Sequence, residues 1–200
     1  MTTMPAVPAT PLSRELVLST ARAQLERDEA SQLSLRAVAR ELGVTAPALY
    51  AYVEDKGELL AAVAAEHFEL LVERFEAITE TEPLDRIRAV SRAYVEHALE
   101  LPGLFHLMFR YPPSPTTEVD AFPPAARAFE VASEATADAV AQGLMAVDDV
   151  TMACMTMWAA MHGVAEVLLM GFGFDDEAAD RLVESTIDTV IAGHVNPLAR

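Results

Sequence analysis

Apolar residues recur every three or four positions along most of the chain, which is the spacing of an α-helix with one buried face. The clearest case is the set Leu35, Val38, Ala39 and Leu42, which recur every three or four positions and give a helix one buried face. Gly43 follows directly, at the place where a residue that tolerates a positive φ commonly ends a helix. The pattern therefore predicts a short helix closed by a tight turn.

A second short helix is predicted after this turn. Thr45 is expected to cap it through its hydroxyl, and Pro47 falls in its first turn, where a missing N–H costs little. Leu49 is expected to point inward. Asp55 and Glu58 then form a D-x-x-E pattern like a capping box, which predicts the start of a long third helix. Two short helices joined by a Gly-containing turn are typical of a helix-turn-helix.

Residues 34–60 resemble the DNA-binding module of the tetracycline-repressor (TetR) family. The resemblance is carried, in fixed register, by Leu35-Arg36, Val38-Ala39, Gly43-Val44, Pro47, Leu49-Tyr50, Tyr52, Lys56 and Glu58-Leu59-Leu60. It implies a homodimeric transcriptional regulator, usually a repressor, that binds a palindromic operator in double-stranded DNA and responds to a small-molecule effector.

Nine residues of this segment are candidate DNA contacts: Ser34, Arg36, Thr45, Ala46, Pro47, Ala48, Tyr50, Tyr52 and Lys56. Ser34 and the two tyrosine hydroxyls can bind phosphates, and Arg36 can reach a phosphate or the O6/N7 edge of guanine. Lys56 falls where the family contacts phosphate. Pro47 and Ala48 offer only apolar contacts. The alternatives are packing between helices for each tyrosine and a solvated surface charge for Arg36.

The rest of the chain is also expected to be helical, which predicts an all-α fold of about nine helices. Residues 1–11 are expected to be a flexible tail, 12–60 the helix-turn-helix domain and 61–200 a ligand-binding and dimerisation domain. The expected helices cover residues 13–27, 56–79, 84–101, 104–108, 125–145, 149–170 and 175–192, with prolines and glycines at the breaks.

Residues 151–170 are apolar nearly all round, so a helix here must be buried on both sides. One side carries Met155, Trp158 and His162 and is expected to face the core or a pocket. The other side is expected to face a second subunit together with the last helix. The predicted dimer interface comprises Met157, Met161, Val164, Leu168, Ala179, Leu182, Val183, Thr186 and Val190.

Trp158, His162 and Gly163 resemble the W…HG signature of one branch of TetR-family C-terminal domains. The indole N–H and the imidazole would be polar groups in an apolar pocket wall. The alternative is that both side chains only pack in the core. The complete set of pocket candidates is Tyr94, His97, Phe105, Met108, Phe109, Met155, Trp158 and His162.

Composition narrows the possible functions. The N-terminus lacks the basic and apolar regions of a secretory signal, and no window reaches the roughly 18 uninterrupted apolar residues of a membrane span, so a cytoplasmic protein is expected. Cys154 is the one cysteine, and the five histidines show no metal-binding or catalytic spacing. No cofactor, metal or enzymatic activity is therefore expected.

The net charge of −17 is divided unevenly along the chain. Residues 1–60 contain 6 basic and 8 acidic residues, a net of −2, whereas residues 61–200 contain 8 and 23, a net of −15. Weak non-specific DNA binding is expected from so little positive charge. Two alternatives remain open: an enzyme or small-molecule carrier with a vestigial helix-turn-helix, and an activator or nucleoid-type DNA binder.

Overall fold

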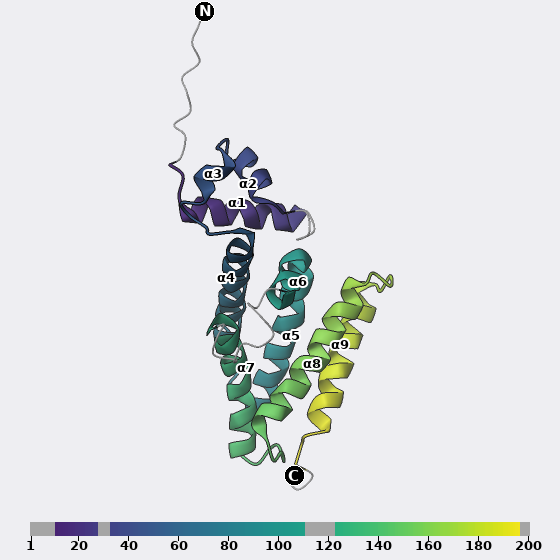
Figure 1. Cartoon of the computed structure of the whole chain (residues 1–200). Coiled ribbons are helices and arrows are strands. Elements are labelled where there is room, and N and C mark those ends of the chain that lie inside the picture. The colour runs from purple at the N-terminus through teal and green to yellow at the C-terminus, as the bar shows by residue number, and fades with distance from the viewer. Residues whose placement is uncertain (1–10, 28–32, 111–122, 197–200) are drawn as a thin grey trace, which may run out of the picture. The chain divides into compact units, whose positions relative to one another are not determined.

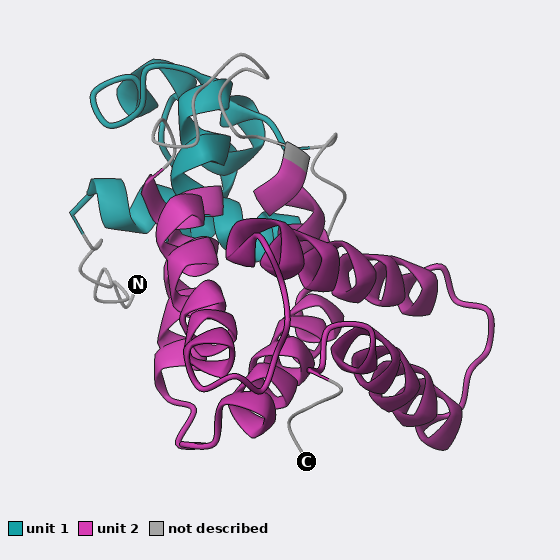
Figure 2. Ribbon diagram, turned by 90° about the horizontal axis from the view of Figure 1, so that it is seen from below, with its two compact units in different colours: residues 1–63 teal, residues 64–200 magenta. Residues whose placement is uncertain are grey.

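The computed structural model describes residues 11–27, 33–110 and 123–196, and these ranges fold into nine α-helices without a strand (Figure 1). The predicted all-α fold is confirmed. The chain forms two compact units, residues 1–63 and 64–200 (Figure 2). The helices are α1 (Arg14–Arg27), α2 (Leu35–Glu41), α3 (Ala46–Leu49), α4 (Lys56–Glu76), α5 (Pro83–Glu100), α6 (Pro102–Arg110), α7 (Pro123–Ala141), α8 (Val150–Leu169) and α9 (Asp176–Ala192).

Unit 1 contains α1, α2, α3 and the first turns of α4. Its core consists of aliphatic side chains that are almost completely buried: Val17, Ala21, Leu25, Val38, Ala39, Leu49, Val53, Leu59 and Leu60. Ser34 caps α2, because its Oγ accepts a hydrogen bond from the amide of Ala37 at 3.1 Å. Gly43 then takes a φ of 70°, a conformation that side chains with a Cβ rarely adopt, and so permits the turn into α3.

The starts of α3 and α4 differ from the expected caps. Thr45 occupies the N-cap position of α3, but its hydroxyl makes no capping hydrogen bond, so that part of the prediction is wrong. At α4 the amide of Glu58 donates to Oδ1 of Asp55 at 2.8 Å. Glu58 Oε2 accepts from the amide of Glu54 at 2.6 Å, one residue earlier than in a capping box.

Unit 2 is built around α5, which packs against α7, α8 and α9. Half of the residues of α5 are buried, because its side chains contact neighbouring helices on several sides. Its core partners include Phe105 and Met108 of α6, Val131 and Ala135 of α7, Met157, Met161 and Val164 of α8, and Val183, Ile187 and Ile191 of α9.

Three helices of unit 2 start earlier than predicted, each at a proline. Pro83, Pro102 and Pro123 are the first residues of α5, α6 and α7. Proline is favourable there because its φ is already helical and the first turn needs no N–H donor. The sequence interpretation treated these prolines as breaks and placed each helix start one or two residues later.

The connection between α7 and α8 is joined to the residues after α9. The amide of Ala146 donates to the carbonyl of His194, and the amide of Asn196 donates to the carbonyl of Leu144, each at 2.9 Å. Gly143, with a φ of 71°, lies just after the end of α7. These two hydrogen bonds hold the residues after α9 against the α7–α8 connection.

α8 is the one helix of the described residues that is long and apolar enough to cross a membrane by length and composition, with a hydropathy of 1.4. The core helix of a soluble protein passes the same test. In unit 2, Met157, Met161 and Val164 place one side of α8 in the core. The apolar composition of α8 therefore has a structural explanation within this unit.

Candidate nucleic-acid interface and candidate effector site

The helix-turn-helix of unit 1 exposes part of the predicted DNA-contact set. α3 is a single turn, and Tyr50 at its C-terminal end is 59% exposed. Thr45 and Pro47 are also exposed, whereas Ala46 and Ala48 are half-buried. Leu49 anchors α3 in the core, and its carbonyl accepts from the amides of Tyr52 and Val53 at 2.8 and 3.1 Å.

The cations of unit 1 differ in how they are engaged. Arg36 is exposed in the first turn of α2, Lys56 is half-buried at the start of α4, and neither forms an ion pair in the described structure. Arg14 is held by Glu58 at 2.6 Å. Arg40 is an exposed cation in the last turn of α2 that the sequence interpretation did not single out. Its exposure follows from its place beside the buried pair Val38 and Ala39 on a helix with one buried face.

Two hydroxyls of the set have defined hydrogen bonds. Ser34 Oγ accepts from Ala37 and keeps its own hydrogen available to a phosphate. Tyr52 donates its hydroxyl hydrogen to the carbonyl of Leu12 at 2.9 Å. The prediction that Tyr52 offers this hydroxyl as a phosphate donor is therefore not supported by the structure. It binds the chain just before α1 instead.

Unit 2 contains a cluster of five aromatic rings supplied by α5, α6 and α8. They are Tyr94, Phe105, Phe109, Trp158 and His162. His162 is near the centre, with ring centroids 4.8 Å from Phe109, 5.3 Å from Phe105 and 5.5 Å from Trp158. The cluster brings together five of the eight predicted pocket residues.

The Tyr94 hydroxyl connects the polar atoms of this cluster. Trp158 donates its indole N–H to the Tyr94 oxygen at 3.1 Å, and His162 Nδ1 lies 2.9 Å from the same oxygen. Trp158 can only donate, so the Tyr94 oxygen accepts this bond, and the same hydroxyl shares a second hydrogen bond with His162 Nδ1. Burial raises the pKa of Tyr94, which keeps its hydroxyl protonated.

Two residues that the sequence interpretation missed lie at the polar edge of the cluster. Glu166 Oε1 is 3.4 Å from Nε2 of His106 and 3.8 Å from Nε2 of His162. Burial lowers the pKa of His162, Glu166 raises it and His106 lowers it. The four-residue spacing of His162 and Glu166 on one helix was a signal that could have identified the pair.

Three predicted pocket residues lie outside the cluster. Met155 is 38% exposed, so it does not belong to a buried wall. Met108 is buried in the core of unit 2. His97 is buried with its ring centroid 5.9 Å from that of His67, and burial, followed by the charge of Arg74, lowers its pKa to about 4. Cys154 is buried too, which raises the pKa of its thiol to about 11.

The predicted dimer-interface set needs a correction. Met157, Met161, Val164 and Val183 are buried inside a single chain, so they have almost no surface to offer a partner. Leu168, Leu182 and Val190 are partly buried against the same core, and Ala179 and Thr186 are half-buried. The exposed side of α8 and the residue that follows the helix instead carry a stripe, defined here by Met152, Met155, Ala159, Gly163 and Met170.

A helix-turn-helix unit followed by a second all-helical unit defines a class of DNA-binding transcriptional regulators. The chain belongs to the TetR family: residues 17–63 match the family model "Bacterial regulatory proteins, tetR family", and residues 87–190 match "Tetracyclin repressor-like, C-terminal domain". A comparison with curated protein sequences found no match.

Solved structures support the same fold. A protein of unknown function from Rhodococcus sp. RHA1 is 27% identical, with a TM-score of 0.82 over 95% of this chain and 100% of that one. The TetR-family regulator PfmR from Thermus thermophilus is 19% identical, with a TM-score of 0.67 over 91% and 97%. FadR from Bacillus subtilis, solved with stearoyl-CoA, is 13% identical, with a TM-score of 0.73 over 90% and 99%.

Proposed function

We propose that this regulator is a cytoplasmic, homodimeric repressor that binds a palindromic operator and leaves it when a small, largely apolar effector binds in unit 2. The observation that carries the proposal is the exposed helix-turn-helix surface, where Arg36, Tyr50 and Lys56 flank an α3 anchored by Leu49. The protein acts by binding alone, without catalysis.

Homodimerisation is proposed through the exposed stripe of α8 and the half-buried side chains of α9. Met152 and Met170 are 61% and 64% exposed in the single chain, which leaves apolar area that association would cover. Ala159 and Gly163 between them are small enough for close helix contact. A two-fold arrangement of this surface would present two reading units to two operator half-sites.

The effector is proposed to bind at the aromatic cluster. Trp158, Phe109 and His162 are only partly buried, so their rings are open to a ligand, whereas Tyr94 and Phe105 form the buried side. FadR was solved with an acyl-CoA, which shows that this fold accommodates a small molecule in that protein. Effector binding must favour one state of the dimer by a few kcal/mol to release DNA.

A second candidate is a small-molecule-binding protein or enzyme with a vestigial helix-turn-helix, favoured by the net charge of −2 over residues 1–60. Selection of bound sequences from a random double-stranded DNA pool separates the candidates. Enrichment of one palindromic sequence supports the regulator. Recovery of bound DNA without a shared sequence favours a nucleoid-type binder, and no recovery favours the vestigial unit. Whether the regulator represses or activates is then tested by transcription from a promoter that carries the selected sequence.

A further inference from the structure

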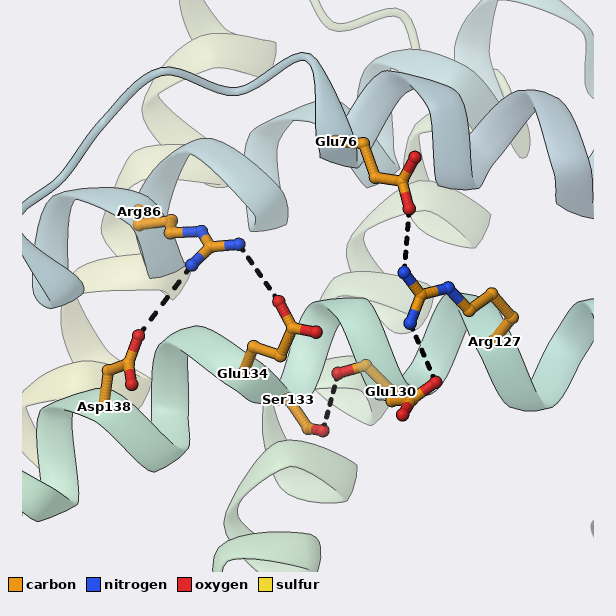
Figure 3. Close-up of polar contacts among 7 residues, drawn as sticks. All are labelled: Glu76, Arg86, Arg127, Glu130, Ser133, Glu134 and Asp138. Carbon is orange, nitrogen blue, oxygen red and sulfur yellow. Dashed lines mark hydrogen bonds and ion pairs between the residues drawn. The ribbon is translucent and has the colours of Figure 1, made fainter.

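The acidic residues of unit 2 differ in the cations they face. Every arginine of unit 2 whose side chain the structure describes is bound to a carboxylate: Arg74 to Glu100, Arg86 to Glu134 and Asp138, Arg88 to Asp188, Arg92 to Glu184, Arg127 to Glu76 and Glu130, and Arg181 to Glu177. Figure 3 shows two of these groups, around Arg86 and Arg127. The described permanent cations of the unit are thus already engaged.

Glu166 is surrounded differently, because its nearest described partners are two imidazoles. His106 Nε2 and His162 Nε2 lie 3.4 and 3.8 Å from its Oε1. Both distances exceed those of an ordinary charge-assisted hydrogen bond. An imidazole carries a charge only when protonated, and burial lowers the pKa of His162. Among the described side chains, the Glu166 carboxylate therefore has no permanent cation beside it.

Aromatic rings surround His162, which lies one turn before Glu166 on α8. Its ring centroid is 5.3 Å from Phe105, 4.8 Å from Phe109 and 5.5 Å from Trp158. Trp158 and Phe109 are partly exposed, at a centroid separation of 5.9 Å. Ring faces attract a cation, and a neighbouring carboxylate adds to that attraction.

We propose that Glu166, Trp158 and Phe109 form a subsite for an organic cation, a protonated or quaternary amine with an apolar body. This inference rests on the proposed function and specifies the effector class of the same site. The cation would lie beside Glu166, and the apolar body would contact the rings. The net charge of −15 over residues 61–200 also favours the approach of a cation over that of an anion.

The same groups fit a metal ion less well. Among the described residues no group of three or more His, Cys, Asp or Glu side chains is placed to hold a metal ion. Glu166 between the two imidazoles also repels an anion, so an organic cation is the ligand class that fits best.

The test uses the fluorescence of Trp158, the only tryptophan of the protein. Benzyltrimethylammonium, which stays charged at all pH values, is titrated against its neutral isostere neopentylbenzene and against phenylacetate. Saturable quenching that favours the quaternary cation at least about tenfold supports the subsite. Equal response to the cation and its neutral isostere, or no saturable response to the cation, overturns it.

Two variants and a pH series make the test specific. Glu166→Gln is expected to weaken cation binding about tenfold and leave the neutral isostere unchanged, whereas Glu69→Gln, which removes a charge from an exposed position of α4, is expected to change neither. Cation binding should also weaken towards acidic pH, because a protonated His162 competes with the ligand for Glu166. Unchanged cation affinity in a folded Glu166→Gln protein overturns the proposal.

Binding and DNA release are measured separately, so that the two proposals fail in different ways. Cation-selective quenching that depends on Glu166 supports the subsite even when a selected operator remains bound, and that combination contradicts only the proposed coupling. Operator binding with no cation-selective quenching supports the DNA-binding function and overturns the subsite.

Discussion

Tyr52 donates its hydroxyl to the main-chain carbonyl of Leu12, 2.9 Å away and forty residues earlier in the chain. The bond joins the end of the helix-turn-helix to the residues that precede α1. Tyr52→Phe keeps the ring and removes this bond, so we expect unit 1 to lose about 0.5–1.5 kcal/mol of stability. Urea unfolding measures the loss, and Tyr50→Phe, at an exposed ring, is the matched control. Equal unfolding curves for Tyr52→Phe and the unsubstituted protein would contradict a structural role for the bond.

The salt dependence of operator binding reports the number of phosphates neutralised. With Arg36 and Lys56 as the main cations in each subunit, a dimer neutralises about four phosphates, and the slope of log K against log salt should be about −4. Arg14 adds nothing because Glu58 holds it. A slope near −10 would show that other cations, such as Arg40, dominate.

Arg36→Ala should reduce the magnitude of that slope by about two, because each dimer loses two phosphate contacts. Arg127→Ala removes an arginine from unit 2 and serves as the control, with an expected slope equal to that of the unsubstituted protein. The measurement is a series of operator titrations at increasing potassium chloride. An unchanged slope for Arg36→Ala would mean that this side chain remains solvated in the complex.

The dimer proposal is tested on the exposed side of α8. A Cβ added at Gly163 meets no atom within 4 Å in the single chain, so Gly163→Glu changes the surface without a clash in the core. A carboxylate there would be buried unpaired in the proposed interface, and we expect a folded monomer with little specific operator affinity. Light scattering gives the mass, and Ala137→Glu on the exposed side of α7 is the control. A Gly163→Glu dimer would place the interface elsewhere.

Substitutions at Trp158 and His162 test whether these side chains sense the effector or only pack in the core. Trp158→Phe removes one donor from Tyr94 and should cost about 0.5–1.5 kcal/mol, well below the roughly 3–5 kcal/mol of emptying a filled core site. His162→Leu removes the hydrogen-bond partner that Tyr94 has in His162 and should cost about 1–3 kcal/mol. If these residues sense the effector, operator release changes more than stability does. Thermal melts and release assays on both variants distinguish the roles, and clear destabilisation with unchanged effector response would exclude sensing.

Buried His97 makes stability depend on pH. Its pKa is about 4 in the folded protein and about 6.5 when unfolded, so below pH 6.5 the unfolded chain binds a proton that the folded chain does not. The contribution of neutral His97 to the free energy of unfolding is therefore fully present above about pH 6.5, and it falls as the pH drops towards 4. This site alone should cost about 2 kcal/mol between pH 7 and pH 5.

Urea unfolding of His97→Leu at the two pH values tests that effect. The pH-dependent loss should be smaller by about the amount assigned to His97, while His106→Gln, at an exposed histidine, should retain it. An equal pH dependence for His97→Leu and the unsubstituted protein would contradict the assignment. His162 contributes in the same direction, because burial lowers its pKa as well.

The sequence predicted the helices well because apolar spacing, glycine and proline act locally. The end of α9 at Ala192 and the turn at Gly43 follow directly from such signals. The prolines at the starts of α5 to α7 were misplaced, since the same residue ends one element and suits the first turn of the next. Local signals thus give the existence of a helix more securely than its first residue.

Features that depend on distant contacts were harder to predict. α8 is apolar nearly all round, so its sequence pattern does not show which side faces the core. Met157 and Met161 were therefore assigned to the interface with a partner subunit, although they fill the core of their own unit. Glu166 and His106 come together from α8 and α6 only in the folded chain. The five-ring cluster was predictable in part because Trp158 and His162 are one turn apart.

The shortness of α3 has a consequence for the thermodynamics of DNA recognition. A single turn of helix, without a side-chain cap at Thr45, has no independent stability and keeps its shape through the burial of Leu49 and Val53. Its amides should therefore exchange with solvent deuterium sooner than those of α1. Operator binding would complete the ordering of this turn, and that coupling would add to the negative heat-capacity change of association.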